Sequence, residues 1–258
     1  MTAQPPAPTS PPAFLTRHLP PPNPDRPHIT LTWAQSLDAK IAGKNGSRVI
    51  LSGPESMLMT HWLRTMHDAI LVGINTIVLD DPRLKIQLIP PHINAHPPQP
   101  LILDPKLRFP LSSRILAEWN ARASKPEVVR QPWILCGDTV DVKLVQQVEQ
   151  AGARVIPVSL DAEGRIPPNA LPDILRSLNL RSVMIEGGSA ILSSFLRSPP
   201  RDDASPLVDS IIVTVAPMFI GDGIGFVPEA DEHALPQIET VYTETMGKDA
   251  VMVCKIKA

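Results

Sequence analysis

Short apolar runs alternate with amphipathic stretches through the first two thirds of the chain, and this alternation limits the possible folds more than any other feature. The run Ala69–Gly73 (AILVG) is apolar without a break, which is typical of a strand buried on both faces of a sheet. The stretch Val142–Gln150 places apolar side chains at helical spacing and is followed by Gly152, a residue common just after helices. Strands that alternate with helices predict a parallel sheet flanked by helices.

The last third of the chain changes character, because its strand-like segments have no convincing helix between them. The expected strands are 28–33, 69–73, 100–103, 133–136, 154–158, 181–185, 208–215, 237–243 and 250–257. The expected helices are 54–66, 142–150, 171–178 and 189–196, the first with Ser52 near its N-cap and Glu55 in a capping box. The pattern predicts an α/β fold in three layers, with a mixed, mostly parallel central sheet and an antiparallel C-terminal edge.

Prolines mark the connections between these elements. The chain has 31 of them, with ten in residues 1–28 and seven from Pro90 to Pro110. We therefore expect residues 1–27 to be a Pro-rich flexible N-terminal segment and residues 28–258 to be a single domain. A ligand for an SH3-type partner is a less favoured interpretation of the tail, since no basic residue flanks a PxxP core convincingly.

The charge and cysteine content exclude several classes of function. A formal net charge of −2 predicts no nucleic acid and no anionic membrane surface as partner. The longest apolar stretches have about ten residues, well short of the roughly 20 that span a bilayer. The N-terminus shows no basic region followed by an apolar core, so we expect no secretory signal. With only Cys136 and Cys254, we expect no disulfide framework and a cytoplasmic protein.

The strongest local motif is Arg181–Ala190 (RSVMIEGGSA), in which a buried strand ends in Glu186 and two glycines lead into a helix. Glycines let the backbone approach a ligand, and a helix N-terminus offers free N–H groups to a phosphate. A plain tight turn is an equally good interpretation of this motif alone, and it is not the GxGxxG fingerprint. At the end of a parallel strand, Glu186 is either a solvated terminus or, more plausibly, a substrate contact.

Two further segments place polar residues after apolar strands. After Gly73, Thr76 can hydrogen-bond a phosphate or ribose and Asp80 a ribose hydroxyl, although on this segment alone an N-capped turn made by Asp and Thr is the better interpretation. After the first strand, Ser36, Asp38 and Lys40 are by themselves simply loop residues.

Other chemistries fit poorly. His92 and His96 lie between Pro91 and Pro97, so they cannot share a stable helix face, and we expect no metal site. Motifs for a nucleophile with its base are missing from the sequence. Hydride transfer, which depends more on positioning a cofactor than on reactive side chains, is therefore favoured.

Taken together, three motifs resemble the riboflavin-biosynthesis reductase family. They are TLTWAQSLDAKIA, SGPESMLMTHWLRTMHDAILVGINTIVLDDPRLKIQ and RSVMIEGGSAILSSFL, and the resemblance runs from about Ile29 to Lys257. It is stronger to the stand-alone fungal and archaeal reductases than to the reductase domain of bacterial bifunctional deaminase-reductases. The chain lacks the zinc deaminase signature, so deamination would belong to another protein.

The resemblance implies a dihydrofolate-reductase-like fold and a homodimer, with NADPH across the carboxyl ends of the central strands and NADH as a possible substitute. The residues that match cofactor contacts are Ala34, Thr76, Asp80, Gly187, Gly188, Ser189 and Ala190. Those that match substrate contacts are Ser36, Arg64, Leu84 and Glu186, with Arg64 suited to a 5′-phosphate. Asp38 and Glu186 are the candidate catalytic acids. Gln87 stands where bacterial relatives carry an arginine, and Arg48, Arg83 or Lys85 could compensate.

The implied reaction is reduction of the ribosylamino side chain of 2,5-diamino-6-ribosylamino-4(3H)-pyrimidinone 5′-phosphate by hydride transfer to C1′. This gives a phosphorylated pyrimidine as the substrate and the ribitylamino form as the product. Two alternatives remain open: a pterin or folate reductase on the same fold, and a non-catalytic interaction protein with a Pro-rich tail.

Overall fold

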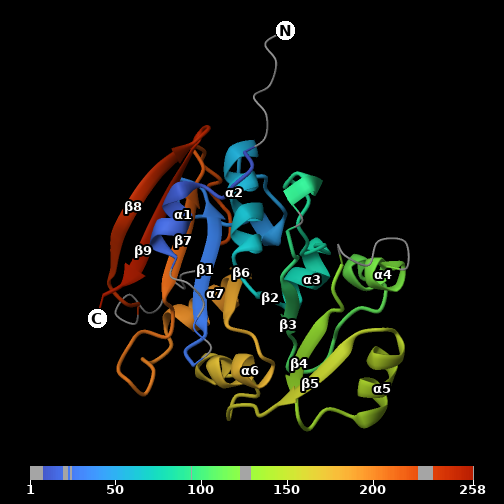
Figure 1. Cartoon of the computed structure of the whole chain (residues 1–258). Helices are drawn as coiled ribbons and strands as arrows, with labels where there is room; N and C mark the ends of the chain where they lie inside the picture. The colour runs from blue at the N-terminus through green and yellow to red at the C-terminus, as the bar shows by residue number, and fades with distance from the viewer. Residues whose placement is uncertain are drawn as a thin grey trace.

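A nine-stranded sheet runs through the molecule and carries helices on both faces (Figure 1). The computed structural model describes residues 8–19, 23, 25–93, 95–122, 129–225 and 235–257. The strands are β1 His28–Gln35, β2 Ala69–Gly73, β3 Gln99–Leu103, β4 Trp133–Gly137, β5 Arg154–Val158, β6 Ser182–Gly187, β7 Ser210–Val215, β8 Ile238–Met246 and β9 Asp249–Ile256. The helices are α1 Ala13–His18, α2 Pro54–Thr65, α3 Ile74–Asp80, α4 Arg114–Asn120, α5 Val142–Gln150, α6 Leu171–Ser177 and α7 Ser189–Leu196.

The strand order is β5-β4-β3-β2-β6-β1-β7-β9-β8. The strands from β5 to β7 in this order are parallel, whereas β7–β9 and β9–β8 pair antiparallel. This confirms the predicted mixed sheet with a parallel centre and an antiparallel C-terminal edge. The carboxyl ends of all the parallel strands lie along one side of the sheet. We call this row of strand ends the carboxyl edge, and the opposite row of strand ends the amino edge; neither is an edge strand.

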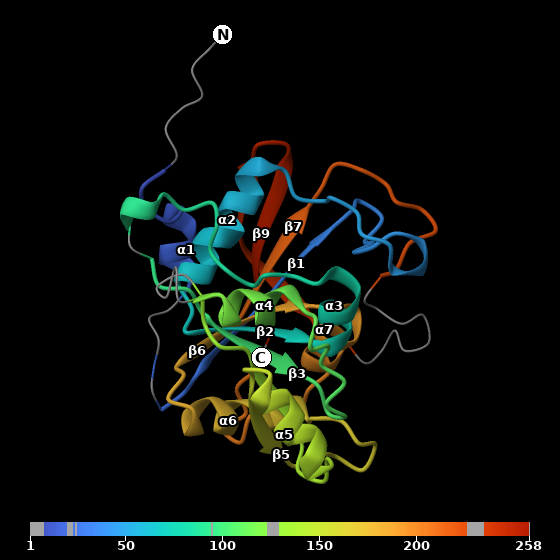
Figure 2. The ribbon, with the colours of Figure 1, turned by 90° about the vertical axis from the view of Figure 1, so that its right-hand side faces the viewer.

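Two apolar cores lie on the two faces of the sheet because side chains alternate along each strand. Helices α1 to α5 contribute to the core on one face, and α6 and α7 to the core on the other (Figure 2). Strand β2 shows the alternation: Ile70 faces the first core and Leu71 the second. Both are fully buried, as a continuous apolar run predicts for a central parallel strand.

Helix α1 departs from the flexible lead-in that the prolines predict for residues 1–27. Phe14, Leu15 and Leu19 are buried in the first core, and Phe14 stacks on Tyr242 with ring centroids 5.7 Å apart. Pro12 is the N-cap of this helix. The apolar side chains between the two proline clusters pack against the first core, so the expectation of flexibility is wrong for α1.

Helices α3 and α4 are also missing from the predicted elements. Helix α3 follows β2 without a break, since Gly73 is both the last strand residue and the helix N-cap. Its sequence INTIVLD is rich in β-branched residues, which lower helix propensity, and this favoured a loop at the sequence level. Burial of Ile74 and Ile77 in the first core stabilises the helix instead.

The N-terminus of α2 is held by a residue far away in the sequence rather than by the predicted capping box. Its N-cap is Gly53, not Ser52, and no side-chain cap is present. The Asp249 carboxylate, at the start of β9, accepts hydrogen bonds from the Gly53 N–H at 2.6 Å and from the Ser56 hydroxyl. Asp249 is fully buried, so this contact fastens α2 to the antiparallel end of the sheet.

Candidate active site

Most of the predicted site residues lie in the last residues of β6 and β1 or follow the ends of β2, β6 and β1, and Arg64 reaches Glu186 from α2. These three strands are neighbours in the sheet. Open α/β sheets bind ligands at this edge, especially where the connections change direction. The described residues include no helix long and apolar enough to cross a membrane.

The turn from β6 into α7 brings two predicted cofactor residues into contact. The Gly188 N–H donates a hydrogen bond to the Thr76 hydroxyl of α3 at 3.0 Å. Gly187 has φ +105°, a conformation that glycine tolerates best, and the Gly187–Gly188 peptide is cis. A Cβ on Gly188 would have only the Thr76 hydroxyl within 4 Å, at 3.4 Å. The protein's own packing therefore does not require glycine at position 188, and this turn is open to a ligand.

Helix α7 begins at this turn with Gly188 as its N-cap, and Ser189 and Ala190 form its first residues. The first N–H groups of a helix have no acceptor within the helix, and the helix dipole adds a partial positive charge there. These residues fit the pyrophosphate of a dinucleotide. We call Gly187, Gly188, Ser189 and Ala190 the phosphate cradle.

Thr76 and Asp80 were expected in a loop, but both belong to α3. Four residues apart in a helix, they share one face. Asp80 is exposed and makes no hydrogen bond or ion pair with the residues that the structure describes. Ala34, the third predicted neighbour of the cofactor, lies in β1 opposite Thr214 of β7.

Glu186 and Arg64, both predicted to contact substrate, bind each other. The Arg64 Nε and Nη2 atoms donate to the two Glu186 carboxylate oxygens at 2.8 Å and 2.7 Å, a bidentate pair. The Arg64 Nη1 donates to the Lys85 carbonyl at 2.7 Å. Their side chains are 14% and 18% exposed, so the pair is mostly buried but still open to solvent.

A β-bulge explains how Glu186 reaches this partner. Leu71 of β2 pairs with Ile185 and Val72 pairs with Gly187, so Glu186 is an extra residue in β6. Bulges bend a strand and change the direction of a side chain, often next to active sites. Here the bulged carboxylate meets the guanidinium that α2 delivers over the sheet.

His61 is a residue of this site that sequence reasoning missed. It lies one turn before Arg64 on α2, it is buried, and its Nδ1 accepts a hydrogen bond from the Gln87 N–H at 3.1 Å. Burial and, to a smaller extent, the nearby Arg64 charge lower the pKa of His61 to about 4, although the Glu186 carboxylate opposes this shift. The histidine is therefore neutral at neutral pH. The three-residue spacing of His61 and Arg64 within a predicted helix was the available signal.

The residues expected to compensate for Gln87 are mostly paired already. Arg83 and Lys85 both bind the Glu118 carboxylate of α4, at 3.1 Å and 3.0 Å. Arg48 is exposed and has no hydrogen bond or ion pair to the described part of the chain.

Leu84 has φ +49° and a buried side chain in the first core, so it can touch a substrate only through its backbone.

Ser36, which the resemblance matches to a substrate contact, and Asp38, a candidate catalytic acid, bind each other. Ser36 is fully buried, and its hydroxyl donates to the Asp38 carboxylate at 2.5 Å. Asp38 also accepts backbone hydrogen bonds from Ile220 at 3.1 Å and Gly221 at 2.7 Å. The hydrogen bonds from the Ser36 hydroxyl and the Gly221 N–H lower the pKa of Asp38 to about 2. A carboxylate held ionised in this way is a poor proton donor.

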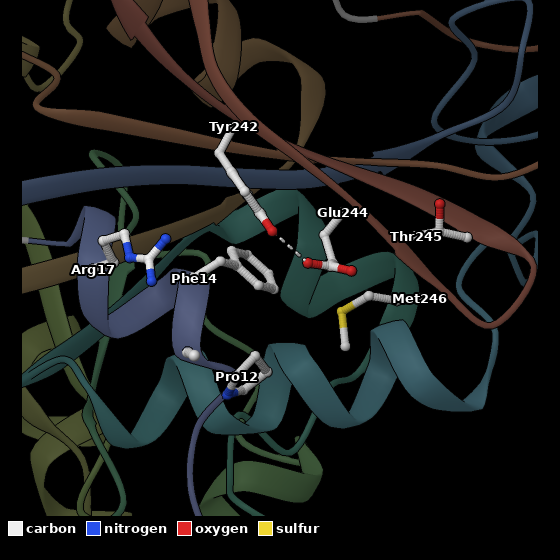
Figure 3. A pocket seen from close by; sticks show the side chains of 8 residues that line it. Pro12, Phe14, Arg17, Tyr242, Glu244, Thr245 and Met246 are labelled. Atoms are coloured by element: carbon white, nitrogen blue, oxygen red, sulfur yellow. Dashed lines mark hydrogen bonds between the residues drawn. The ribbon is translucent and has the colours of Figure 1, made fainter.

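A cavity of about 240 Å³ lies elsewhere, between α1 and β8 (Figure 3). Phe14 and Arg17 line it from α1, and Tyr242 and Glu244 line it from β8, where the tyrosine hydroxyl donates to the glutamate at 2.8 Å. None of the predicted site residues line this cavity. We therefore place the candidate active site at the carboxyl edge.

A phosphate cradle and a charged pair at the carboxyl edge of a parallel sheet define an α/β enzyme of the nucleotide-binding kind. Comparison with known proteins specifies the class further. Residues 27–252 match the model of the RibD C-terminal domain, and the chain belongs to this family.

Curated relatives carry a more specific name. The 2,5-diamino-6-ribosylamino-4(3H)-pyrimidinone 5′-phosphate reductase of Candida glabrata is 36% identical over 236 residues, which cover 88% of this chain and 90% of the relative. The enzyme of that name from Methanothermobacter thermautotrophicus is 31% identical over 90% of this chain and 99% of the relative. Among solved structures, the Saccharomyces cerevisiae riboflavin biosynthesis reductase Rib7 has a TM-score of 0.70 and 26% identity, over 95% of this chain and 98% of that chain.

Proposed function

We propose that this chain is the NADPH-dependent reductase of riboflavin biosynthesis that acts on 2,5-diamino-6-ribosylamino-4(3H)-pyrimidinone 5′-phosphate. The reaction converts the ribosylamino side chain to the ribitylamino form. The observation that carries the proposal is the placement of an open phosphate cradle and a mostly buried arginine–carboxylate pair at the same sheet edge. The names of relatives that span most of the chain support it.

The cofactor proposed for the cradle is NADPH, which supplies the hydride when bound. The N–H groups of Ser189 and Ala190 would hold its pyrophosphate at the start of α7. Thr76, already in contact with Gly188, would add a hydroxyl, and Asp80 would accept from a ribose hydroxyl. Ala34 on β1 would border the nicotinamide. The chain's role is to hold the two reacting carbons together.

Arg64 and Glu186 are proposed to hold the substrate. Glu186 suits the donor groups of an aminopyrimidine, and Arg64 keeps that carboxylate in place. Arg64 also remains the proposed partner of the 5′-phosphate, through the Nη1 atom that now donates to the Lys85 carbonyl. His61, neutral and one helical turn away, adds a polar group to this part of the site without adding charge.

Neither of the two candidate acids, Asp38 and Glu186, is free to deliver the proton that accompanies hydride transfer. Asp38 is held ionised, and both oxygens of Glu186 are bound by Arg64. We therefore assign proton delivery to bound water or to the hydroxyl groups of the substrate. Asp38 receives a different role below.

We further propose that the chain is a cytoplasmic homodimer whose Pro-rich N-terminal residues 1–27 precede one reductase domain, 28–258. Both cysteines, Cys136 and Cys254, are free and buried, which suits a reducing compartment. Strand β8 is an open edge of nine residues on which Ile238 and Val241 are 49% and 37% exposed. Natural proteins rarely leave such an edge uncovered. Sedimentation of the purified chain measures whether two copies associate.

The decisive assay follows NADPH oxidation by the purified protein. Three substrates are compared: the diaminopyrimidine ribosyl phosphate, its deaminated analogue and dihydrofolate. We expect turnover with the first, little with the second and none with dihydrofolate. NADPH binding without turnover of any of the three would reject the assigned substrate, and no NADPH binding would reject the reductase proposal as a whole.

A further inference from the structure

Two loops lie side by side at the carboxyl edge, one after β1 and one after β7 (Figure 2). We call residues 36–50 the β1 loop and residues 216–224 the β7 loop. Four backbone hydrogen bonds join them: the Leu37 N–H donates to the Met218 carbonyl at 2.8 Å, the Ile41 and Ala42 N–H groups donate to the Ile224 carbonyl at 2.8 Å and 3.4 Å, and the Ile224 N–H donates to the Ala42 carbonyl at 2.9 Å. Ala42 and Ile224 thereby form an antiparallel bridge. The two loops are one unit.

Asp38 is the side chain at the centre of this unit. One of its oxygens accepts from the Ser36 hydroxyl of its own loop and from the Ile220 N–H of the β7 loop. The other oxygen accepts from the Gly221 N–H. Hydrogen bonds to an ionised carboxylate are about twice as strong as neutral ones. A side chain that ties two backbone donors of a second loop in this way acts as a clamp.

Two of the large apolar side chains of the unit lie outside the core, although Ile41 packs against the second core. Leu37 is 53% exposed and Phe219 is 74% exposed, although both are large apolar side chains. An exposed ion pair between Lys44 and Asp222, at 2.7 Å, is the other side-chain hydrogen bond or ion pair between the loops in the part of the chain that the structure describes. Exposed pairs of this kind contribute little. Apart from the backbone hydrogen bonds, Asp38 is therefore the main polar side-chain link between the two loops among the described residues.

The unit reaches across the proposed cofactor site. The β1 loop begins directly after β1, the strand that carries Ala34. At the far end of the unit, Ile224 and Leu79 of α3 both lie beside Gly46: a Cβ on that glycine would be 3.8 Å from one and 3.9 Å from the other. The unit thus extends from the end of β1 to the helix that carries Thr76.

We propose that Asp38 is a positioning residue of the reduction, which clamps the β1 loop and the β7 loop into one wall beside the nicotinamide and the substrate. This role rests on the proposed function and replaces the catalytic acid that the sequence suggests. It also accounts for the lowered pKa of Asp38, because a clamp needs a carboxylate that stays ionised, whereas an acid needs one that can hold a proton.

The first test compares Asp38→Asn with Asp222→Asn. Both variants remove a carboxylate that joins the two loops, but Asp222 is exposed and binds only Lys44. An asparagine amide at position 38 would turn a donor toward one of the backbone N–H groups. If the unit is then in place about a tenth of the time, the Kd for NADPH rises about tenfold. We expect Asp222→Asn to bind NADPH as the wild type does, and the pH profile of kcat to keep its shape in both variants.

The second test restores the clamp by a covalent bond. Ala42→Cys and Ile224→Cys, combined with Asp38→Asn, place two thiols on a hydrogen-bonded antiparallel pair, whose Cα atoms lie about 5.5 Å apart. That spacing suits a disulfide. The native cysteines are buried, so oxidised glutathione should act on the new pair. Oxidation is expected to recover most of the NADPH affinity, and reduction is expected to remove it again.

A proton donor could not be replaced by a cross-link between loops. If the oxidised triple variant keeps the raised Kd for NADPH of Asp38→Asn, or if Asp38→Asn loses one limb of the pH profile with unchanged NADPH affinity, the positioning role is overturned. Unchanged kinetics in Asp38→Asn would overturn it as well. Failure of the wild type to bind NADPH or reduce the substrate is a separate result, because it rejects the proposed function before any variant is made.

Discussion

The two edges of the central sheet both carry buried charges and hydrogen-bonded polar groups, but they use them differently. At the amino edge, the polar side chains bind one another and leave little exposed. At the carboxyl edge, the charged pair is partly exposed, a Cβ on Gly188 would contact only the Thr76 hydroxyl, and large apolar side chains such as Phe219 are exposed to solvent. This difference in exposure distinguishes residues that stabilise the fold, at the amino edge, from residues that are available to bind a ligand, at the carboxyl edge.

Asp209 is the centre of the amino-edge cluster. Its carboxylate accepts from Arg201 at 2.8 Å, from Arg26 at 2.6 Å and from the Ile29 N–H at 2.8 Å. The side chains of Asp209 and Arg201 are only 8% and 10% exposed. These contacts join the start of β1 to the start of β7. A cluster this closed has no room for a substrate, so we expect it to affect stability alone.

The largest expected effect is therefore on stability, from Asp209→Ala. Removing one partner leaves Arg201 buried without its charge partner, which costs about 3–5 kcal/mol. Urea unfolding measures the free energy of unfolding, and Asp173→Ala, which breaks an exposed pair with Arg176, is the control. At a temperature where the variant is folded, NADPH oxidation should proceed at the wild-type rate. A large loss of activity in folded protein would break the proposed separation of the two edges.

Arg64→Ala is expected to have the opposite result at the carboxyl edge. It removes the partner of Glu186 and the proposed phosphate contact, and the loss of a charge-assisted contact costs about 1.5–3 kcal/mol, or roughly 10- to 150-fold in substrate KM. NADPH affinity should change little. Arg83→Ala, which removes a guanidinium that binds Glu118, is the matched control. Normal substrate binding by Arg64→Ala would place the phosphate elsewhere, with Arg48 as the next residue to test.

Acid should weaken the fold through the amino edge. His67 is buried, bonded to Thr30 at 2.8 Å and to the Leu63 carbonyl at 2.9 Å, and burial lowers its pKa to about 4. The unfolded chain then binds a proton that the folded chain does not, at every pH between about 4 and 6.5. The free energy of unfolding should therefore fall as the pH is lowered through this window, by up to about 1.4 kcal/mol per pH unit for this one group, which urea unfolding at several pH values measures.

His67→Gln and His61→Gln together sharpen the comparison of the edges. Both histidines have a pKa lowered to about 4, but His61 lies beside Arg64 and Glu186. Each variant should reduce the slope of stability against pH. Only His61→Gln should also raise the substrate KM. If both variants raised the substrate KM equally, changes at the amino edge would affect substrate binding, and the proposed separation of the two edges would be wrong.

The sequence alone predicted the elements whose periodicity is unambiguous. Strands such as Ala69–Gly73 and helices such as Val142–Gln150 were placed correctly because their apolar patterns fit only one structure. Helix α3 was not predicted, since its β-branched residues favour a strand or loop and only packing against the first core makes it helical. Local propensity and tertiary packing disagree there, and packing decides.

The candidate site, like the fold, was predictable only where it follows from the pattern of strands. Parallel strand ends meet at one edge, so the gathering of Thr76 and Gly188 follows from the strand pattern once the strand order is known. The pairing of Glu186 with Arg64 depends on a β-bulge that no sequence period reveals. The clamp at Asp38 depends on backbone donors far along the chain, and a backbone N–H gives no sign in the sequence of what it will bind.

Gly188→Val tests the cradle with a smaller expected effect. Gly188 has φ −58°, which any residue adopts, so the fold should be preserved. The new side chain would occupy the space assigned to pyrophosphate and weaken NADPH binding at least tenfold, or about 1.4 kcal/mol. Gly187→Ala is the contrasting variant: at φ +105° it should lower the melting temperature. Unchanged NADPH affinity in Gly188→Val, measured by fluorescence titration, would reject the cradle.

The smallest expected effect belongs to Asp80, and its sign is informative. Asp80 is the last residue of α3, where the helix dipole is negative and an acidic side chain is slightly unfavourable. It is exposed and has no partner among the described residues, so nothing in the fold compensates for this position. A residue that weakens its own helix is expected at a functional site. Asp80→Asn should therefore leave the melting temperature unchanged or slightly raised, and it should raise the KM for NADPH about two- to fivefold, as loss of one exposed polar contact does. A lower melting temperature with an unchanged KM would instead make Asp80 part of the turn that ends α3. Asp80 would then stabilise the fold as the amino-edge residues do, against the proposed difference between the two edges.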